Sequence, residues 1–237
     1  TTAQVAGLST AQVQALSSTQ LNALTTTQVQ ALETADVAAL SNTQVSGLAS
    51  ASATALTSSQ VNALTSTQVQ SLTSAQINAL DTADVAAMST SQISSLTTAQ
   101  LPQVATGQIA ALTTSQVSNL STAQVAALTT AQVKVITTEQ FANLTTDQVA
   151  SLSSVLIPAL KPEQVTVMTT SQIASLGSAQ VALLTTSQLQ ALTTAQVPSL
   201  TTSQLSALDA DASALTTAQL SALSSANVAG LATAALA

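Results

Sequence analysis

An eight-residue repeat runs through the chain and limits the folds that are open to it. From Thr1 the sequence reads TTAQVAGL, STAQVQAL, SSTQLNAL and TTTQVQAL. Residues 1–208 divide into 26 such octads in one phase, with Gln at the fourth position in 22 of them and Leu at the eighth in 22. The fifth position is always apolar. A period this short indicates a stack of small units rather than one large core.

One continuous helix does not fit this period. Eight residues at about 100° each rotate the apolar pair by about 80° per octad, so no face of a long helix or coiled coil stays apolar. A helix that restarts in every octad does fit, because Ser or Thr at position one and Gln at position four form a capping box. The preceding Leu and the following Val then form a hydrophobic staple. The sequence therefore predicts an all-α solenoid of very short capped helices, one per octad.

This frame assigns a structural role to each position of the octad. Positions one and four cap the helix, and positions five and eight supply the core. In the first, second and sixteenth octads the predicted capping residues are Thr1, Gln4, Ser121 and Gln124, and the predicted core residues are Val5, Leu8, Val13, Leu16, Val125 and Leu128.

Proline and acidic residues test the same frame. Pro162 falls at the first helical position, where its missing N–H does no harm. Proline at the sixth position removes an N–H that a helix would use, so those octads are predicted to hold little more than one helical or 3₁₀ turn. Sixth-position prolines are Pro102, Pro158 and Pro198, and acidic residues in the first helical turn are Asp36, Asp84, Glu139, Asp147 and Glu163.

A β-solenoid is the alternative fold, with Thr, Gln and Val stacked between coils of two or three octads. Val and Leu, three residues apart, would lie on opposite faces of a straight strand, so each octad would need a corner. Such corners usually use Gly, Asn or Asp, whereas the chain has five Gly in all. Ala, Leu and Gln favour helix. A disordered chain is a third alternative.

No octad is expected to fold alone. Burial of one Val and one Leu does not offset the conformational entropy of eight residues, so neighbouring octads must share their burial. We expect residues 1–237 to form a single continuous array, with a one-residue deletion in the segment 209–215, DADASAL. The repeat is in register at Thr1 and stops within an octad at Ala237, which suggests a longer array.

Composition argues against several classes of function. The chain has no His and no Cys, so common nucleophile–base pairs and nitrogen or sulfur metal sites cannot form. We therefore expect no enzyme activity, no catalytic residues and no cofactor. Two Lys against nine acidic residues, with one Phe and no Trp or Tyr, argue against nucleic acid as a partner. The longest aliphatic run, near 155–160, falls far short of the ~20 residues of a membrane helix, so we expect no membrane insertion.

Three acidic pairs are candidate calcium ligands. Glu33 with Asp36, and Asp81 with Asp84, occupy positions one and four of their octads, where capping is the favoured interpretation. The third pair, in the segment 209–211, lacks the Gly and the distant Glu of an EF-hand loop. It consists of Asp209 and Asp211. The sequence predicts no metal site.

The octads STAQVAAL at 121–128 and TTSQLQAL at 185–192 resemble octapeptide arrays of large secreted bacterial surface proteins, often described as adhesin-like. The resemblance covers essentially the whole chain. It implies an extracellular or cell-surface structural segment and carries over no functional residues.

Function is therefore expected to be structural. The predicted outer surface of Thr, Ser, Gln and Asn has little charge to oppose contact between copies. We expect a protein that forms or extends an extracellular filament, stalk or matrix fibre by stacking and self-association, with copies of itself as partner. The alternative is a surface-binding module, an adhesin or an ice-binding face built from Thr and Gln columns, that contacts a glycan or another surface.

Overall fold

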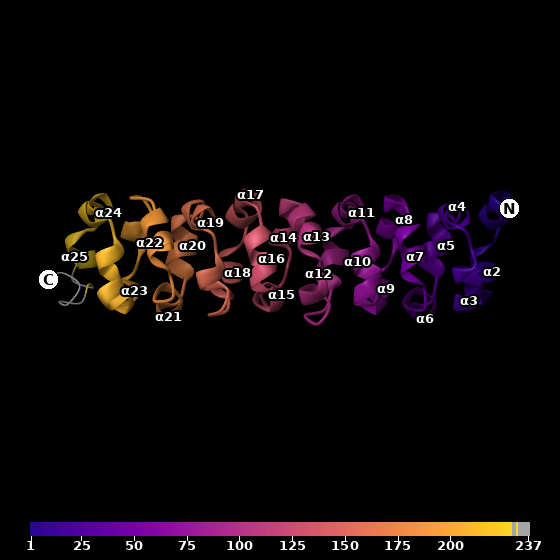
Figure 1. Ribbon diagram of the computed structural model, residues 1–237, viewed down its shortest axis with the longest axis horizontal. Coiled ribbons are helices and arrows are strands. Elements are labelled where there is room, and N and C mark those ends of the chain that lie inside the picture. Colours follow the sequence, from indigo (N-terminus) through magenta and orange to yellow (C-terminus); the bar gives the residue numbers. More distant parts are fainter. Residues whose placement is uncertain (229–230, 232–237) are drawn as a thin grey trace. The chain divides into compact units, whose positions relative to one another are not determined.

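The computed structural model describes residues 1–228 and 231, apart from the side chains of residues 209, 210 and 226. It forms two compact units, Thr1–Leu120 and Ser121–Ala237, which we describe separately. Both consist of short helices, and no strand occurs within the described residues (Figure 1). The predicted all-α solenoid is confirmed, and the β-solenoid alternative is not supported.

Unit 1 holds one helix per octad. Its elements are α1 (Thr2–Ala6), α2 (Thr10–Ala15), α3 (Ser18–Asn22), α4 (Thr26–Gln30), α5 (Thr34–Ala39), α6 (Asn42–Ser46), α7 (Ser50–Thr54), α8 (Ser58–Ala63), α9 (Ser66–Ser71), α10 (Ser74–Ala79), α11 (Thr82–Ala87), α12 (Thr90–Ser95), the 3₁₀ helix η1 (Leu101–Gln103), α13 (Thr106–Ala111) and α14 (Thr114–Ser118).

Unit 2 continues the same pattern. Its elements are α15 (Thr122–Ala127), α16 (Thr130–Val135), α17 (Thr138–Ala142), α18 (Thr146–Ala150), η2 (Ile157–Ala159), α19 (Pro162–Thr166), α20 (Thr170–Ser175), α21 (Ser178–Val181), α22 (Thr186–Ala191), η3 (Val197–Ser199), α23 (Thr202–Leu208), η4 (Asp209–Ala214), α24 (Thr217–Ala222) and α25 (Ser225–Val228).

Each α-helix begins at the second position of its octad, directly after the predicted cap. The connection between α8 and α9 shows how one helix leads to the next. Leu64, the C-cap residue directly after α8, has a ψ of 136°, and Thr65, the N-cap residue of α9, has a ψ of 158°. Both residues have negative φ. Two extended residues therefore turn the chain without a left-handed conformation. Because glycine is the residue that favours that conformation, the connections between octads need few glycines.

The octads with a sixth-position proline, predicted to hold little more than one helical or 3₁₀ turn, hold 3₁₀ helices of three residues. Pro102, Pro158 and Pro198 lie in η1, η2 and η3. Proline has no N–H to donate to the carbonyl four residues earlier, so the tighter i→i+3 turn replaces the α-helical one. Val104, for example, donates to the carbonyl of Leu101 at 3.1 Å.

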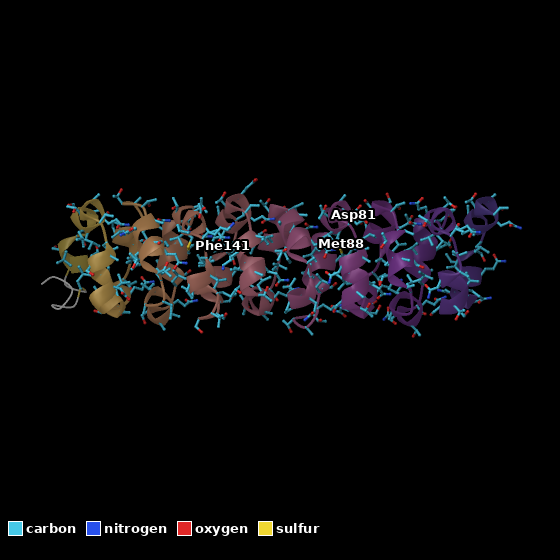
Figure 2. The ribbon with its side chains drawn as sticks, in the orientation of Figure 1. Asp81, Met88 and Phe141 are labelled. Carbon is cyan, nitrogen blue, oxygen red and sulfur yellow. The ribbon has the colours of Figure 1, made fainter. Side chains whose placement is uncertain are left out.

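The side chains of positions five and eight form the core of each unit. In Figure 2, Met88 lies inside unit 1 and Phe141 inside unit 2, and both are buried. Leu8 and Leu16 differ from the prediction, because they are only half-buried. They belong to the first turn of unit 1, where later octads cover them from one side only, whereas Leu32 is 6% exposed.

Hydrogen bonds between octads define the turn of the solenoid. The side chain of Asn78, at position six, donates to the carbonyl of Gln103, three octads later, at 2.8 Å. Gln76, at position four, donates to the carbonyl of Leu48, four octads earlier, at 2.7 Å. Because each octad contacts octads both three and four away, one turn holds between three and four octads. Helix packing agrees, since α8 packs on α5 and α11.

Candidate functional site

The fourth-position glutamines form the most regular polar feature of the structure, and we call them the glutamine ladder. Gln60 is a representative member and is 2% exposed. Its Oε1 accepts the backbone N–H of Thr57 at 2.9 Å, which completes the capping box of α8. Its Nε2 donates to the carbonyls of Val29 and Leu32, both at 2.8 Å. One amide thus caps the start of its own helix and the end of a helix four octads earlier.

The same pair of contacts recurs in both units. The carbonyls reached lie 28 and 31 residues before the glutamine, at positions eight and five of the earlier octad. Buried backbone carbonyls at helix ends need such donors, because water does not reach them. Described members with a contact at the 28-residue spacing are Gln44, Gln60, Gln68, Gln76, Gln92, Gln100, Gln108, Gln116, Gln164, Gln172, Gln180, Gln188, Gln196 and Gln204.

The one-residue deletion in 209–215 leaves the ladder intact. Gln219, which follows the deletion, donates to the carbonyls of Leu189 and Leu192. These carbonyls lie 30 and 27 residues earlier, one fewer than elsewhere. Locally α23 runs directly into η4 without a capped start, so the missing residue is absorbed in the connection between octads.

The predicted capping residues belong to two capping boxes. Thr1 and Gln4 form the capping box of α1, and Ser121 and Gln124 form that of α15. The N–H of Ser121 donates to Gln124 Oε1 at 2.8 Å, and the N–H of Gln124 donates to Ser121 Oγ at 3.1 Å. Gln4 is exposed, whereas Gln124 is 2% exposed.

The predicted core residues lie beside these caps. Val5 is 6% exposed and Val13 is fully buried. In α15 and directly after it, Val125 is 1% and Leu128 is 6% exposed. Leu8 and Leu16 are the half-buried members of the predicted core set.

Sequence reasoning assigned the glutamine a capping role and did not find the octad that its Nε2 reaches. One signal was present. Glu completes a capping box as well as Gln does, yet the array uses Gln at 22 of 26 fourth positions. A strong preference for the amide over the acid indicates that the donor end of the side chain is also used.

The two acidic pairs at positions one and four have different surroundings. Asp81 Oδ1 accepts the N–H of Asp84 at 2.7 Å, and α11 has a complete capping box. Asp81 lies near the outside of unit 1 in Figure 2. Glu33, at the equivalent position before α5, makes no side-chain cap. Asp81 and Asp84 therefore form a capping box, whereas Glu33 and Asp36 do not.

No group of three or more acidic side chains suited to a metal ion occurs among the described residues. The D-x-D pair cannot be compared with them, because the side chain of Asp209 lies outside the described residues. In the part of the chain that is described, no helix is both long and apolar enough to cross a membrane. Apolar space between the helices is small, with a cavity of about 20 Å³ in unit 1 between side chains such as Val69, Met88 and Leu112.

Comparison with known proteins identifies the repeat. No curated protein matches the chain. The family model of the ALTTAQ repeat matches residues 1–34, 29–66, 77–114, 98–130 and 117–154, which together make up more than half of the sequence. The chain belongs to the ALTTAQ repeat family.

Proposed function

We propose that this protein is a non-enzymatic structural element that forms or extends an extracellular filament, stalk or matrix fibre through contacts between copies. The glutamine ladder is the observation that supports this proposal most. The repeated polar column is used to join octads of one chain to one another, so it builds the elongating array that a filament or stalk needs.

The outer surface supports self-association. Positions two and three of most octads are exposed and carry Ser, Thr or Ala. Ionised side chains are few, with two Lys and nine acidic residues in 237. Little electrostatic repulsion therefore opposes side-by-side contact between copies.

Association can be tested by adding charge where the fold tolerates it. Third positions already carry acidic residues at Glu139, Asp147 and Glu163, near the positive ends of their helices. A triple variant with Ala123→Glu, Ser187→Glu and Ala195→Glu changes three exposed third positions in unit 2. The matched control carries Gln at the same three positions.

The measurement is analytical ultracentrifugation over a concentration series, with electron microscopy of the same samples. We expect the unmodified chain and the Gln control to form assemblies at high concentration, and the Glu variant to form fewer of them. A chain that stays monomeric throughout would contradict self-association. Cell fractionation, with detection of the chain outside the cell or at its surface, tests the location.

Exposed second-position threonines favour a second candidate, a surface-binding module. Thr2, Thr10 and Thr26 are exposed members of this column. A regular row of hydroxyl and methyl groups could contact a glycan or an ice surface. Thermal hysteresis or a glycan-array signal, lost when exposed second-position Thr are replaced by Lys, would support this function over the structural one.

A further inference from the structure

Two octads of unit 1 replace the ladder glutamine with aspartate, and their carboxylates differ in hydrogen bonding. Asp84 is 5% exposed; its Oδ1 accepts the hydroxyl of Ser58 at 2.7 Å and its Oδ2 accepts the N–H of Asp81 at 3.4 Å. Asp36 is 2% exposed, and its Oδ2 is a buried oxygen without a hydrogen-bond partner. A buried, unpartnered carboxylate oxygen is costly unless a positive group lies against it.

The register of the ladder indicates what surrounds Asp36. The ladder glutamines named above, from Gln44 to Gln204, donate to a carbonyl 28 residues earlier, as Gln44 does to that of Leu16 at 2.7 Å. For position 36 the equivalent carbonyls belong to Leu8 and Val5, at the C-terminal end of α1. An ionised carboxylate has no N–H to offer them, so this place in the ladder gathers oxygen atoms where the octads with Gln have an amide donor.

Glu33 adds a second carboxylate. In other octads the side chains of positions one and four meet directly, as with Ser17 Oγ and Gln20 Oε1 at 3.0 Å. Glu33 occupies position one of the octad of Asp36, is exposed and makes no side-chain cap. Two like charges at these positions repel one another unless a cation lies between them.

We propose that Asp36 and Glu33, together with the carbonyl of Leu8 and that of Val5, bind a calcium ion. Carboxylate and carbonyl oxygens are the hard ligands that Ca²⁺ takes, and its flexible geometry suits a site assembled from two separate octads. Exposure of Glu33 leaves room for water to complete the coordination shell. The ion would join octad one to octad five, as the amide does elsewhere.

Calcium titration of the whole chain by calorimetry, after removal of divalent ions, tests the site. We expect one Ca²⁺ per chain with a dissociation constant on the order of 10⁻⁴ to 10⁻³ M, the range of weak extracellular sites. Asp36→Gln restores the ladder amide, so this variant should fold and lose the binding. Asp84→Gln is the matched control and should keep it, because the Asp84 carboxylate already has its donors.

Thermal melting with calcium or with a chelator gives a second readout. The melting temperature of the unmodified chain and of Asp84→Gln should rise with Ca²⁺, and that of Asp36→Gln should not respond. Glu33→Gln changes an exposed side chain and should weaken binding by at least about tenfold without unfolding the chain. The proposal is wrong if the unmodified chain shows neither saturable heat nor a melting shift, if Asp36→Gln binds as well as Asp84→Gln, or if Glu33→Gln leaves the affinity unchanged.

Discussion

Gln60 Nε2 donates to the backbone carbonyl of Leu32, 28 residues earlier, at a distance of 2.8 Å. Because Oε1 of the same amide caps α8, this one side chain joins the start of its own helix to the end of another. A local capping motif is thereby extended into a tertiary contact. The repeated amide explains how helices of four to seven residues, too short to be stable alone, hold together in each unit.

Replacing Gln60 with Glu separates the two halves of this contact. The variant keeps an acceptor for Thr57 but loses both donors and places a negative charge against the carbonyls of Val29 and Leu32. We expect the free energy of unfolding to fall by about 3–5 kcal/mol, as when a buried charge is left without a partner. Denaturant unfolding followed by circular dichroism measures the change.

Gln12→Glu is the control for that prediction, because Gln12 is exposed and makes only the local capping contacts. Its unfolding free energy should change by no more than about 0.5 kcal/mol. Equal losses in the two variants would show that the amide acts through capping alone and that the contacts to the earlier octad add nothing.

The local part of this structure could be predicted from the sequence, because its cause lies within one octad. Thr57 and Gln60 carry the capping signal themselves, and Pro102 alone is enough to indicate that its octad holds little more than one helical or 3₁₀ turn. The number of octads per turn depends on which distant carbonyl Gln60 reaches, and every octad offers the same carbonyls. A perfect repeat contains no local signal that distinguishes a partner three octads away from one four octads away.

The surroundings of the acidic residues also depend on contacts that lie outside their own octad. The pairs Glu33/Asp36 and Asp81/Asp84 occupy identical positions, and their sequence favours capping for both. Only Asp81 makes a side-chain cap, and Asp84 also accepts the hydroxyl of Ser58, which lies in another octad. Burial of Leu8 also could not be judged from its own octad, since it depends on how many turns pack against it.

Proline tolerance should follow octad position. Ala126, at position six of the octad that contains α15, is exposed. Ala126→Pro should convert that helix to a 3₁₀ turn like η2, with a smaller loss of stability than proline at the next position. Ala127→Pro, one residue later, lies at a position where none of the four prolines of the chain occurs and should cost about 3 kcal/mol. Thermal unfolding of both variants provides the test, and a larger loss for Ala126→Pro would contradict the positional rule.

Phe141 is the largest fully buried side chain of the described core. Phe141→Ala removes most of that side chain from a site with no solvent access, so the unfolding free energy should fall by about 3–5 kcal/mol. Val155 is 65% exposed, and Val155→Ala should change it by no more than about 0.5 kcal/mol. Denaturation curves of the two variants under one set of conditions measure both losses of unfolding free energy. A loss for Phe141→Ala as small as that for Val155→Ala would contradict this prediction.

Two glycine-to-alanine substitutions should have opposite signs. A Cβ at Gly47 would collide with the side chain of Ser18, three octads earlier, and would lie 3.0 Å from the carbonyl oxygen of Thr43. Gly107, at the third position of the octad that contains α13, has nothing within 4 Å of an added Cβ. Gly47→Ala should therefore cost about 1–3 kcal/mol through overpacking, whereas Gly107→Ala should gain about 0.5–1 kcal/mol through helix propensity.

A double-mutant cycle locates the cause of the Gly47 effect. Ser18→Gly removes the side chain that the new Cβ would meet, so Gly47→Ala should cost less in the Ser18→Gly background than in the unmodified chain. Unfolding free energies of the two single variants and the double variant give the coupling. Additive losses would mean that the clash lies with the Thr43 carbonyl, and the close approach of octads three apart would then not be what requires glycine at position 47.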